Sequence, residues 1–287
     1  MLKVLPCLDS DGMAAARRRE LDLSRDVAVE LGRSAVEITG KGYYVCEGGR
    51  RVDVSRSVAA ACAAKVSIPP EAALPAGDAP PFPETRVQVT NETTLGAARR
   101  LAAGGRKVVA LNFANGTEPG GGFLRGATAQ EEALCRSSAL YATLVDDPMY
   151  RVHGRDAPFE ASDWVIYSPD VPVFRVDDGT ALGKPWLLSF ITCAAPYEPE
   201  IGQPESGDLL QRRIGRVLAV ARAYGHATLV LGAWGCGAFG NDPQRTARDF
   251  RTALETEFDG AFSDVVFAVA DWSRVRRILG PFRDVFV

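Results

Sequence analysis

Two adjacent glutamates, Glu131 and Glu132, follow a loop that is unusually rich in glycine. The loop comes after an apolar strand expected at 107–111, and a helix is expected to begin at about Gln130. Glycine lets the backbone approach a ligand closely, and the first turn of a helix offers free N–H groups and the positive end of a dipole. A strand, a glycine loop and a helix start therefore make a cradle for a diphosphate. A plain phosphate-binding loop would gain nothing from two carboxylates, which sets this loop apart.

The adjacent positions of the two glutamates exclude one shared role, because neighbouring residues on a helix point about 100° apart. One carboxylate caps the helix or holds a hydroxyl group, while the other faces the reaction. Glu131 also has a purely structural interpretation: Thr128-x-x-Glu131 matches a capping box, in which the glutamate reaches back to the backbone of the capping residue. That interpretation leaves Glu132 unexplained.

A second glycine-rich loop, residues 235–240, follows an apolar strand at 228–232 and precedes a helix that Asp242 and Pro243 begin. Its spacing fits Gly-x-Gly-x-x-Gly, the fingerprint of dinucleotide-binding loops. The acidic residues about twenty positions later fall inside the predicted helix, however, and not at a strand end where they would meet a ribose. A nicotinamide-dependent oxidoreductase is therefore disfavoured. Neither loop ends in Gly-Lys-Ser/Thr, which disfavours an NTPase more strongly.

Three side chains near the loops, Asn112, Asn115 and Phe239, have both a structural and a functional interpretation. The amides are either turn residues or, at the carboxyl end of a strand, ligands of ribose hydroxyls. The aromatic ring either plugs the core or stacks on a sugar or base. Cys135 and Cys193 lie in apolar surroundings, which favours packed thiols over nucleophiles.

The composition limits the class of protein. A chain of 287 residues holds one large domain, or one domain with an extension. Its net charge of −3 gives no general attraction to a polyanion, so direct nucleic-acid binding is not expected and a nucleotide-like substrate must be recognised locally. Six separated cysteines and only two histidines argue against a structural zinc site and against a disulfide scaffold. His153 and His226 are expected at the surface or in loops.

The sequence predicts a reduced, cytoplasmic location without membrane contact. Asp9 and Asp11 follow the short apolar N-terminus, and no export-type cleavage site appears. The longest mainly apolar run, 186–197, is too short to span a bilayer. The separated cysteines agree with a reducing compartment.

Residues 1–84 are predicted to form a mainly helical N-terminal extension packed on the core. Its expected elements are a helical stretch at 12–38 that breaks near Leu23–Ser24 or Gly32, a hairpin of 43–46 and 51–54, a helix at 55–64 capped by Ser55, and a proline-rich linker or surface loop at 69–83.

From residue 85 to 287, strands and helices alternate. Strands are expected at 86–90, 107–111, 164–167, 171–176, 186–192, 228–232 and 264–270, and helices at 93–104, 130–145, 208–224, 243–258 and 273–279, with a proline-rich loop at 196–204. This alternation predicts a three-layer α/β domain with helices on both faces of the sheet. Ligands bind such sheets beyond the carboxyl ends of the strands, where both glycine loops are expected.

At these residues the chain resembles the bacterial-type poly(ADP-ribose) glycohydrolases, which have a macrodomain fold. The family signature is Gly-Gly-Gly, a short spacer and Gln-Glu-Glu, and it stands here as Gly120-Gly121-Gly122, seven residues, and Gln130-Glu131-Glu132. The stretches 112–115 and 235–241 and the helical extension widen the resemblance to most of residues 15–280. The resemblance implies a three-layer α/β/α macrodomain-like domain with a mixed sheet, spanning residues 85–287.

The resemblance also implies roles for individual residues. Glu132 is expected to be the catalytic acid and base, and Glu131 is expected to orient the terminal ribose, which Asn115 also contacts. The second loop would wrap the diphosphate with backbone N–H groups, and Phe239 would pack near the terminal ribose. The remaining residues assigned to the substrate site are Asn112, Gly120, Gly121, Gly122, Gln130, Gly235, Cys236, Gly237, Ala238, Gly240 and Asn241. Asn91–Glu92 is only a weak candidate for the adenine site, and no metal or organic cofactor is implied.

The expected substrates and partners are poly(ADP-ribose), ADP-ribose and ADP-ribosylated proteins. Most glycoside hydrolases use two separated carboxylates, a geometry that adjacent helical glutamates do not offer. The hypothesis is therefore a one-carboxylate scheme, in which Glu132 protonates the leaving 2′ oxygen of the ribose–ribose bond and then activates water. A non-catalytic ADP-ribose-binding macrodomain reader and a hydrolase of mono-ADP-ribosylated proteins remain alternatives. A part in the DNA damage response is suggested by the resemblance alone.

Overall fold

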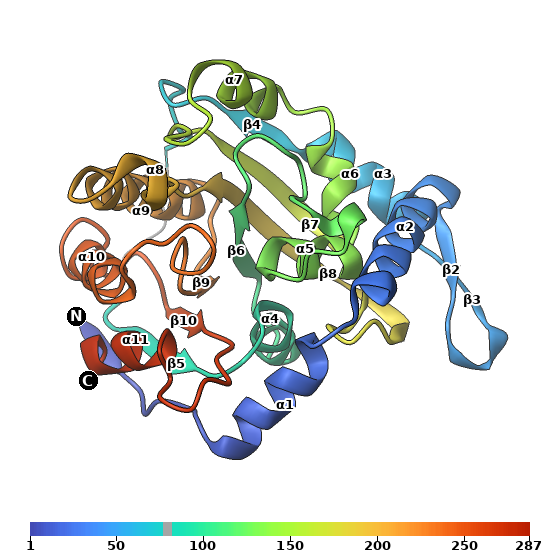
Figure 1. Cartoon of the computed structure of the whole chain (residues 1–287), viewed down its shortest axis with the longest axis horizontal. Helices are drawn as coiled ribbons and strands as arrows, with labels where there is room; N and C mark the ends of the chain where they lie inside the picture. Colours follow the sequence, from blue (N-terminus) through green and yellow to red (C-terminus); the bar gives the residue numbers. More distant parts are fainter. Residues whose placement is uncertain (77–81) are drawn as a thin grey trace.

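The computed structural model describes residues 1–76 and 82–287, and an eight-stranded mixed sheet runs through its centre (Figure 1). The strands lie in the order β1 (Leu2–Val4), β5 (Thr85–Thr90), β10 (Asp264–Ala268), β9 (Thr228–Leu231), β6 (Val108–Ala114), β8 (Ala181–Ala194), β7 (Val165–Arg175) and β4 (Val66–Ile68). The first six pair in parallel, whereas β7 is antiparallel to both β8 and β4.

Helices cover both faces of the sheet. Alternate residues of β6 point to opposite sides, so Val109 and Leu111 join one apolar cluster while Val108 and Ala110 join the other. The first cluster includes side chains of α9 (Glu205–Ala223), α10 (Pro243–Glu255) and α11 (Leu279–Val285). The second includes side chains of α2 (Arg25–Lys41), α3 (Ser55–Ala64), α4 (Thr94–Ala103), α5 (Gln130–Ser137) and α6 (Leu140–Leu144). The predicted three-layer α/β/α mixed sheet is confirmed.

The N-terminal helices meet at the first of the two predicted breaks. α1 (Asp11–Leu21) ends before Asp22, and Ser24 caps α2 by accepting from the N–H of Val27. The alternative break at Gly32 is wrong, because Gly32 lies inside α2 with its backbone against Phe123, and an added Cβ would come within 2.7 Å of the Phe123 carbonyl oxygen. Glycine here lets α2 pack closely on the loop that precedes the glutamates.

The first 84 residues also contribute to the central sheet, through its two edge strands β1 and β4. The expected hairpin forms from β2 (Tyr43–Val45) and β3 (Arg51–Asp53) and projects from the side of the molecule (Figure 1). Within the predicted loop 69–83, the carbonyls of Pro69 and Ala72 accept hydrogen bonds from Arg216 on α9, while residues 77–81 lie outside the described residues. A domain division at residue 84 stays a prediction.

Local hydrogen bonds change several predicted boundaries. The helix predicted at 130–145 is two helices, because the N–H of Ala139 bonds the carbonyl of Pro172 on β7 and interrupts the turn. The strands predicted at 164–167 and 171–176 are one irregular strand, β7. Val54, not Ser55, is the N-cap of α3, and the loop at 196–204 contains the short helix α8 (Glu198–Ile201).

The terminal helix predicted at 273–279 is also wrong. Asp271 accepts from the N–H groups of Ser273, Ile278 and Leu279, which folds that stretch back on its carboxylate and starts α11 at Leu279.

Candidate active site

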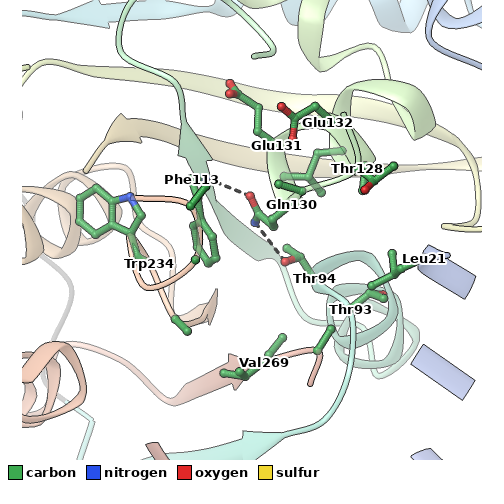
Figure 2. A pocket seen from close by; sticks show the side chains of 18 of the residues that line it. Leu21, Thr93, Thr94, Phe113, Thr128, Gln130, Glu131, Glu132, Trp234 and Val269 are labelled. Carbon is green, nitrogen blue, oxygen red and sulfur yellow. Dashed lines mark hydrogen bonds between the residues drawn. The ribbon is translucent and has the colours of Figure 1, made fainter. Parts of the chain in front are cut away.

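A cavity of about 370 Å³ lies at the carboxyl ends of the parallel strands (Figure 2). Residues after β5, β6, β9 and β10 line it, together with the start of α5, a turn after β7 and one residue of α1. Both glycine-rich regions reach this edge of the sheet, as predicted. The lining residues include Glu92, Thr93, Thr94, Asn115, Gln130, Glu131, Glu132, Asp177, Gly235, Gly237, Ala238, Phe239, Val269 and Trp272.

Glu131 is held inside this edge by two donors from β6 and the residue after it. Its Oε1 accepts from Asn112 Nδ2 at 3.2 Å and its Oε2 accepts from the backbone N–H of Asn115 at 2.7 Å. The predicted capping box is wrong, because Ala129 is the N-cap of α5 and has no side-chain capping bond. Burial outweighs the donated hydrogen bonds and raises the pKa of Glu131 to about 8. Glu131 is therefore a largely protonated carboxyl group at neutral pH.

The side chain of Glu132 contacts the glycine triplet, Gly120–Gly122, and not β6. Its Oε1 accepts from the N–H of Gly122 at 2.9 Å, and the side chain is buried but lines the cavity. Gly121 has a left-handed backbone with φ of +57°, and an added Cβ would lie 2.5 Å from Glu132 Oε1 and 3.1 Å from Glu131 Oε2. The triplet therefore fits closely around the two carboxyl groups, which explains why glycine precedes them.

Gln130 fastens the start of α5 to the sheet. Its Nε2 donates to the carbonyl of Leu111 and to Thr94 Oγ1, and its Oε1 accepts from the N–H of Phe113 at 3.0 Å (Figure 2). Three hydrogen bonds to β6 and α4 leave this side chain little freedom. Gln130 thus fixes the orientation of the first turn of α5, and with it the directions of the Glu131 and Glu132 side chains.

The two asparagines mainly order the protein around Glu131. Asn112 is buried, and its Nδ2 also donates to Thr192. Asn115 lines the cavity, yet its Oδ1 accepts from Thr117 and Glu118 in a tight turn. The turn interpretation of Asn115 is therefore confirmed, and its contact with ribose stays a prediction. Gly120, Gly121, Gly122 and Asn112 are not among the residues that line the cavity.

The second loop presents backbone donors to the cavity. The N–H groups of Gly235, Gly237, Ala238 and Phe239 have no acceptor within the described parts of the chain. Gly235 is left-handed with φ of +77°, and Gly237 and Ala238 are exposed. Unpaired backbone donors in a turn form a concave site that suits an anion.

Asn241 and Cys236 support this loop from beneath. The buried amide of Asn241 donates to the carbonyls of Pro196, Gly235 and Phe239 and accepts from Ser206. Cys236 is buried, bonds the carbonyl of Trp234, and has a pKa raised to about 12 by burial, so its thiol stays neutral. Neither residue, nor Gly240, lines the cavity.

Sequence patterns missed several residues that line the cavity. Asp177 follows β7, accepts from Thr93 Oγ1 at 2.7 Å, and has a pKa raised to about 6 by burial. Trp272 follows β10 and is 45% exposed. The weak adenine candidates separate, because Glu92 lines the cavity whereas Asn91 is buried and bonds Asp9 and Asp271. The sequence signal that could have indicated Asp177 and Glu92 was their position as polar residues just after a strand.

The prediction of a surface or loop position is wrong for His153, which is buried on a helix, and holds for His226, which lies in the loop before β9 with its side chain buried. His153, on α7 (Pro148–Asp156), bonds the carbonyl of Gly116 with Nδ1 and Ser162 Oγ with Nε2. It therefore supports the loop after β6 from behind. His226 bonds the hydroxyl of Tyr167 at 2.8 Å.

Within residues 1–76 and 82–287, no group of three or more His, Cys, Asp or Glu side chains is arranged to hold a metal ion. Nor does any helix there have the length and apolar character needed to cross a membrane.

Comparison with known proteins gives a consistent family. Residues 32–176 match the family model described as microbial-type PARG, catalytic domain, where PARG is poly(ADP-ribose) glycohydrolase. The PARG of Thermomonospora curvata is 43% identical, with a TM-score of 0.86 over 91% of this chain and 99% of that one. Its structure bound to the inhibitor ADP-HPD is 44% identical, with a TM-score of 0.85 over 90% of this chain and 99% of the other.

The PARG of Deinococcus radiodurans in complex with ADP-ribose is 42% identical, with a TM-score of 0.73 over 79% of this chain and 96% of that one. No significant match was found among curated proteins. The signature that suggested the family therefore lies in a chain whose whole fold agrees with it. This chain belongs to the microbial-type poly(ADP-ribose) glycohydrolases.

Proposed function

We propose that Glu132 is the general acid and base with which this glycohydrolase cuts the ribose–ribose bond of poly(ADP-ribose). The observation that carries the assignment is the contrast between two neighbouring carboxyl groups. Both oxygens of Glu131 accept hydrogen bonds from the β6 side, whereas the carboxyl group of Glu132 has one hydrogen bond among the described residues, from Gly122, and lines the cavity. Glu132 is therefore the residue with an oxygen left for a substrate.

The reaction needs one proton delivered and one removed. Glu132 gives its proton to the 2′ oxygen of the leaving unit as the bond to C1″ of the terminal ribose breaks, which leaves an oxocarbenium ion on the terminal ADP-ribose. The ionised Glu132 then takes a proton from a water molecule, and the resulting hydroxide oxygen bonds to C1″. The products are free ADP-ribose and a chain shortened by one unit, and Glu132 is protonated again.

The second loop supplies the charge complementarity for this scheme. Its unpaired N–H groups at Gly235, Gly237, Ala238 and Phe239 suit the diphosphate of the terminal unit. A diphosphate fixed there carries negative charge near the sugar that becomes cationic. The related T. curvata and D. radiodurans enzymes have been solved with ADP-HPD and ADP-ribose, which supports an ADP-ribose unit as the occupant here.

Glu131 is assigned to positioning and not to nucleophilic attack. Its two oxygens already accept from Asn112 and Asn115, and its raised pKa keeps it largely neutral near pH 7. A neutral carboxyl group is a poor nucleophile but orders a sugar hydroxyl well. Retaining glycosidases instead use two carboxylates about 5 Å apart on either side of the bond.

Incubation of automodified poly(ADP-ribose) with the wild type and Glu132→Gln tests the assignment. The glutamine oxygen still accepts from Gly122, so the loop is retained while the transferable proton is lost. We expect ADP-ribose release by the wild type alone and ADP-ribose binding by both. Release by Glu132→Gln contradicts the role of Glu132. Binding without release by either protein favours a reader, and release only from mono-ADP-ribosylated protein favours the alternative hydrolase.

We also propose a reducing, cytoplasmic compartment for this enzyme. All six cysteines are free thiols, and Cys46, Cys135, Cys193 and Cys236 are buried. Proteins of oxidising compartments commonly pair their cysteines. Fractionation of the native cells, with the enzyme followed by its activity, tests the location.

A further inference from the structure

Three aromatic side chains form a continuous row that begins in the cavity and ends at the surface. Phe239 lines the cavity, and its ring centroid lies 5.7 Å from that of Tyr197, edge to face. The ring of Phe159 stacks on Tyr197, with centroids 6.1 Å apart and planes inclined by 29°. Phe159 is 45% exposed, so its contact with Tyr197 leaves a large part of the residue open to solvent.

Backbone hydrogen bonds hold this row in place. The N–H of Tyr197 donates to the carbonyl of Phe159 at 2.9 Å, and the N–H of Glu198 donates to the carbonyl of Phe239 at 3.0 Å. The buried amide of Asn241 bonds the same carbonyl of Phe239. Three loops, after α7, β8 and β9, are thus joined, and the rings they carry need no rearrangement before binding.

The row also borders the loop that holds Glu131. Phe159 belongs to the segment that contains Ala161, and an added Cβ on Gly116 would lie 3.2 Å from the Cβ of Ala161. Gly116 directly follows Asn115, whose N–H bonds Glu131. His153 fixes the carbonyl of Gly116 from the helix that precedes Phe159. Phe159 is not among the residues that line the cavity, so the outer end of the row lies outside it, on the side of the loop that holds Glu131.

The substrate has an aromatic group at the corresponding place. The oxygen that leaves in the reaction is the 2′ oxygen of an adenosine, and the adenine of that adenosine is attached to the adjacent carbon of the same ribose. When the terminal ADP-ribose fills the cavity, this adenine must lie outside it and close to the bond that is cut. Flat bases stack on exposed aromatic rings with little regard to sequence.

We propose that Phe159, backed by Tyr197, is a stacking platform for the adenine of the unit that leaves. This inference rests on the cleavage position that the assignment of Glu132 defines. Glu160, the residue that follows Phe159 in the chain, is acidic, which favours an uncharged base over a diphosphate at this surface. The platform gives the enzyme a contact with the chain that free ADP-ribose cannot make, and it favours polymer over single ADP-ribosyl groups.

Steady-state cleavage of di(ADP-ribose) by Phe159→Ala tests the platform, with ADP-ribose as a competitive product inhibitor in the same assays. Loss of one half-exposed stacking contact is expected to raise KM for di(ADP-ribose) by about five- to tenfold. The inhibition constant of ADP-ribose should not change, because ADP-ribose occupies only the cavity. The KM of Phe159→Trp should be close to that of the wild type, since an indole ring stacks on a base at least as well as a phenyl ring.

The matched control is Leu187→Ala, which removes a similarly exposed apolar side chain on β8 that does not line the cavity. Its KM should equal that of the wild type. The inference is overturned by an unchanged KM in Phe159→Ala, or by equal weakening of di(ADP-ribose) and ADP-ribose, which would mean that the cavity itself was disturbed. A wild type that leaves di(ADP-ribose) intact would instead contradict the glycohydrolase scheme, and the inference with it.

Discussion

The N–H of Gly122 donates to Glu132 at 2.9 Å, while the other glutamate of the pair, Glu131, is held from β6. Two adjacent carboxyl groups therefore have different partners and different freedom. Glycine makes this separation possible, because Gly121 lies between them without a side chain.

Gly121→Ala should inactivate the enzyme. The added methyl would lie 2.5 Å from Glu132 Oε1, and alanine at φ of +57° costs about 1–2 kcal/mol. A carboxyl group displaced by about 1 Å can lose about 100-fold in rate, and we expect a fall in kcat of that order. The control is Gly215→Ala on α9, where an added Cβ meets nothing within 4 Å. Full kcat in Gly121→Ala would contradict the close fit.

The free energy of unfolding should depend on pH through Glu131. Below pH 4.5 both the folded and the unfolded state hold the proton, so the group adds no pH dependence. Between 4.5 and about 8 the unfolded state releases the proton while the folded state keeps it, so stability falls as pH rises and levels off above the folded pKa of Glu131. The full loss is on the order of a few kcal/mol.

Urea unfolding of the wild type and Glu131→Gln at pH 5, 7 and 9 measures this loss. Asn112 Oδ1 has no hydrogen-bond partner within the described residues, so a turned Asn112 amide can accept from the new glutamine. In Glu131→Gln, the free energy of unfolding should fall much less between pH 5 and pH 9 than it does in the wild type. Asp177, with a pKa raised to about 6, contributes to the lower part of the window in both proteins. Parallel pH profiles would contradict a neutral Glu131.

Asn241→Ala should weaken ADP-ribose binding, although Asn241 does not line the cavity. It removes an amide that bonds Pro196, Gly235, Phe239 and Ser206, and it leaves buried carbonyls unpaired at a cost of about 1–3 kcal/mol. A loosened second loop should raise the Kd for ADP-ribose by about tenfold. Calorimetry measures the Kd, with Gln88→Ala as the control because its exposed amide bonds the carbonyl of Pro6 and Gln88 does not line the cavity. Unchanged binding would show that the loop is ordered without Asn241.

Local patterns were sufficient to locate the inner strands of the sheet, both glycine loops and the start of α5, but they missed the two short edge strands, β1 and β4. Asp242 and Pro243 do begin α10 as predicted, because capping depends on residues a few positions apart. The same local logic failed for Glu131, whose partners Asn112 and Asn115 lie on a neighbouring strand and the loop after it. In the sequence, a glutamate of a capping box cannot be distinguished from one held by a strand that is separate in the chain.

Residues brought in by tertiary contacts were harder to predict. Asp177 reaches the cavity because β7 and β8 form a long antiparallel pair that ends beside α4, and nothing near Asp177 in the chain signals this. His153 is buried because α7 packs beneath Gly116. The helix predicted at 273–279 was wrong for a similar reason. The side chain of Asp271 accepts hydrogen bonds from N–H groups that would donate to backbone carbonyls in such a helix.

The most direct test of the account is the single-turnover release of ADP-ribose from di(ADP-ribose) by Glu132→Gln, with the Kd for ADP-ribose measured on the same preparation. General acid–base catalysis contributes about 100- to 10,000-fold, so the rate should fall by that factor while the Kd stays within about twofold of the wild type. A release rate close to that of the wild type would contradict Glu132 as the proton donor and would move that role to another residue of the cavity.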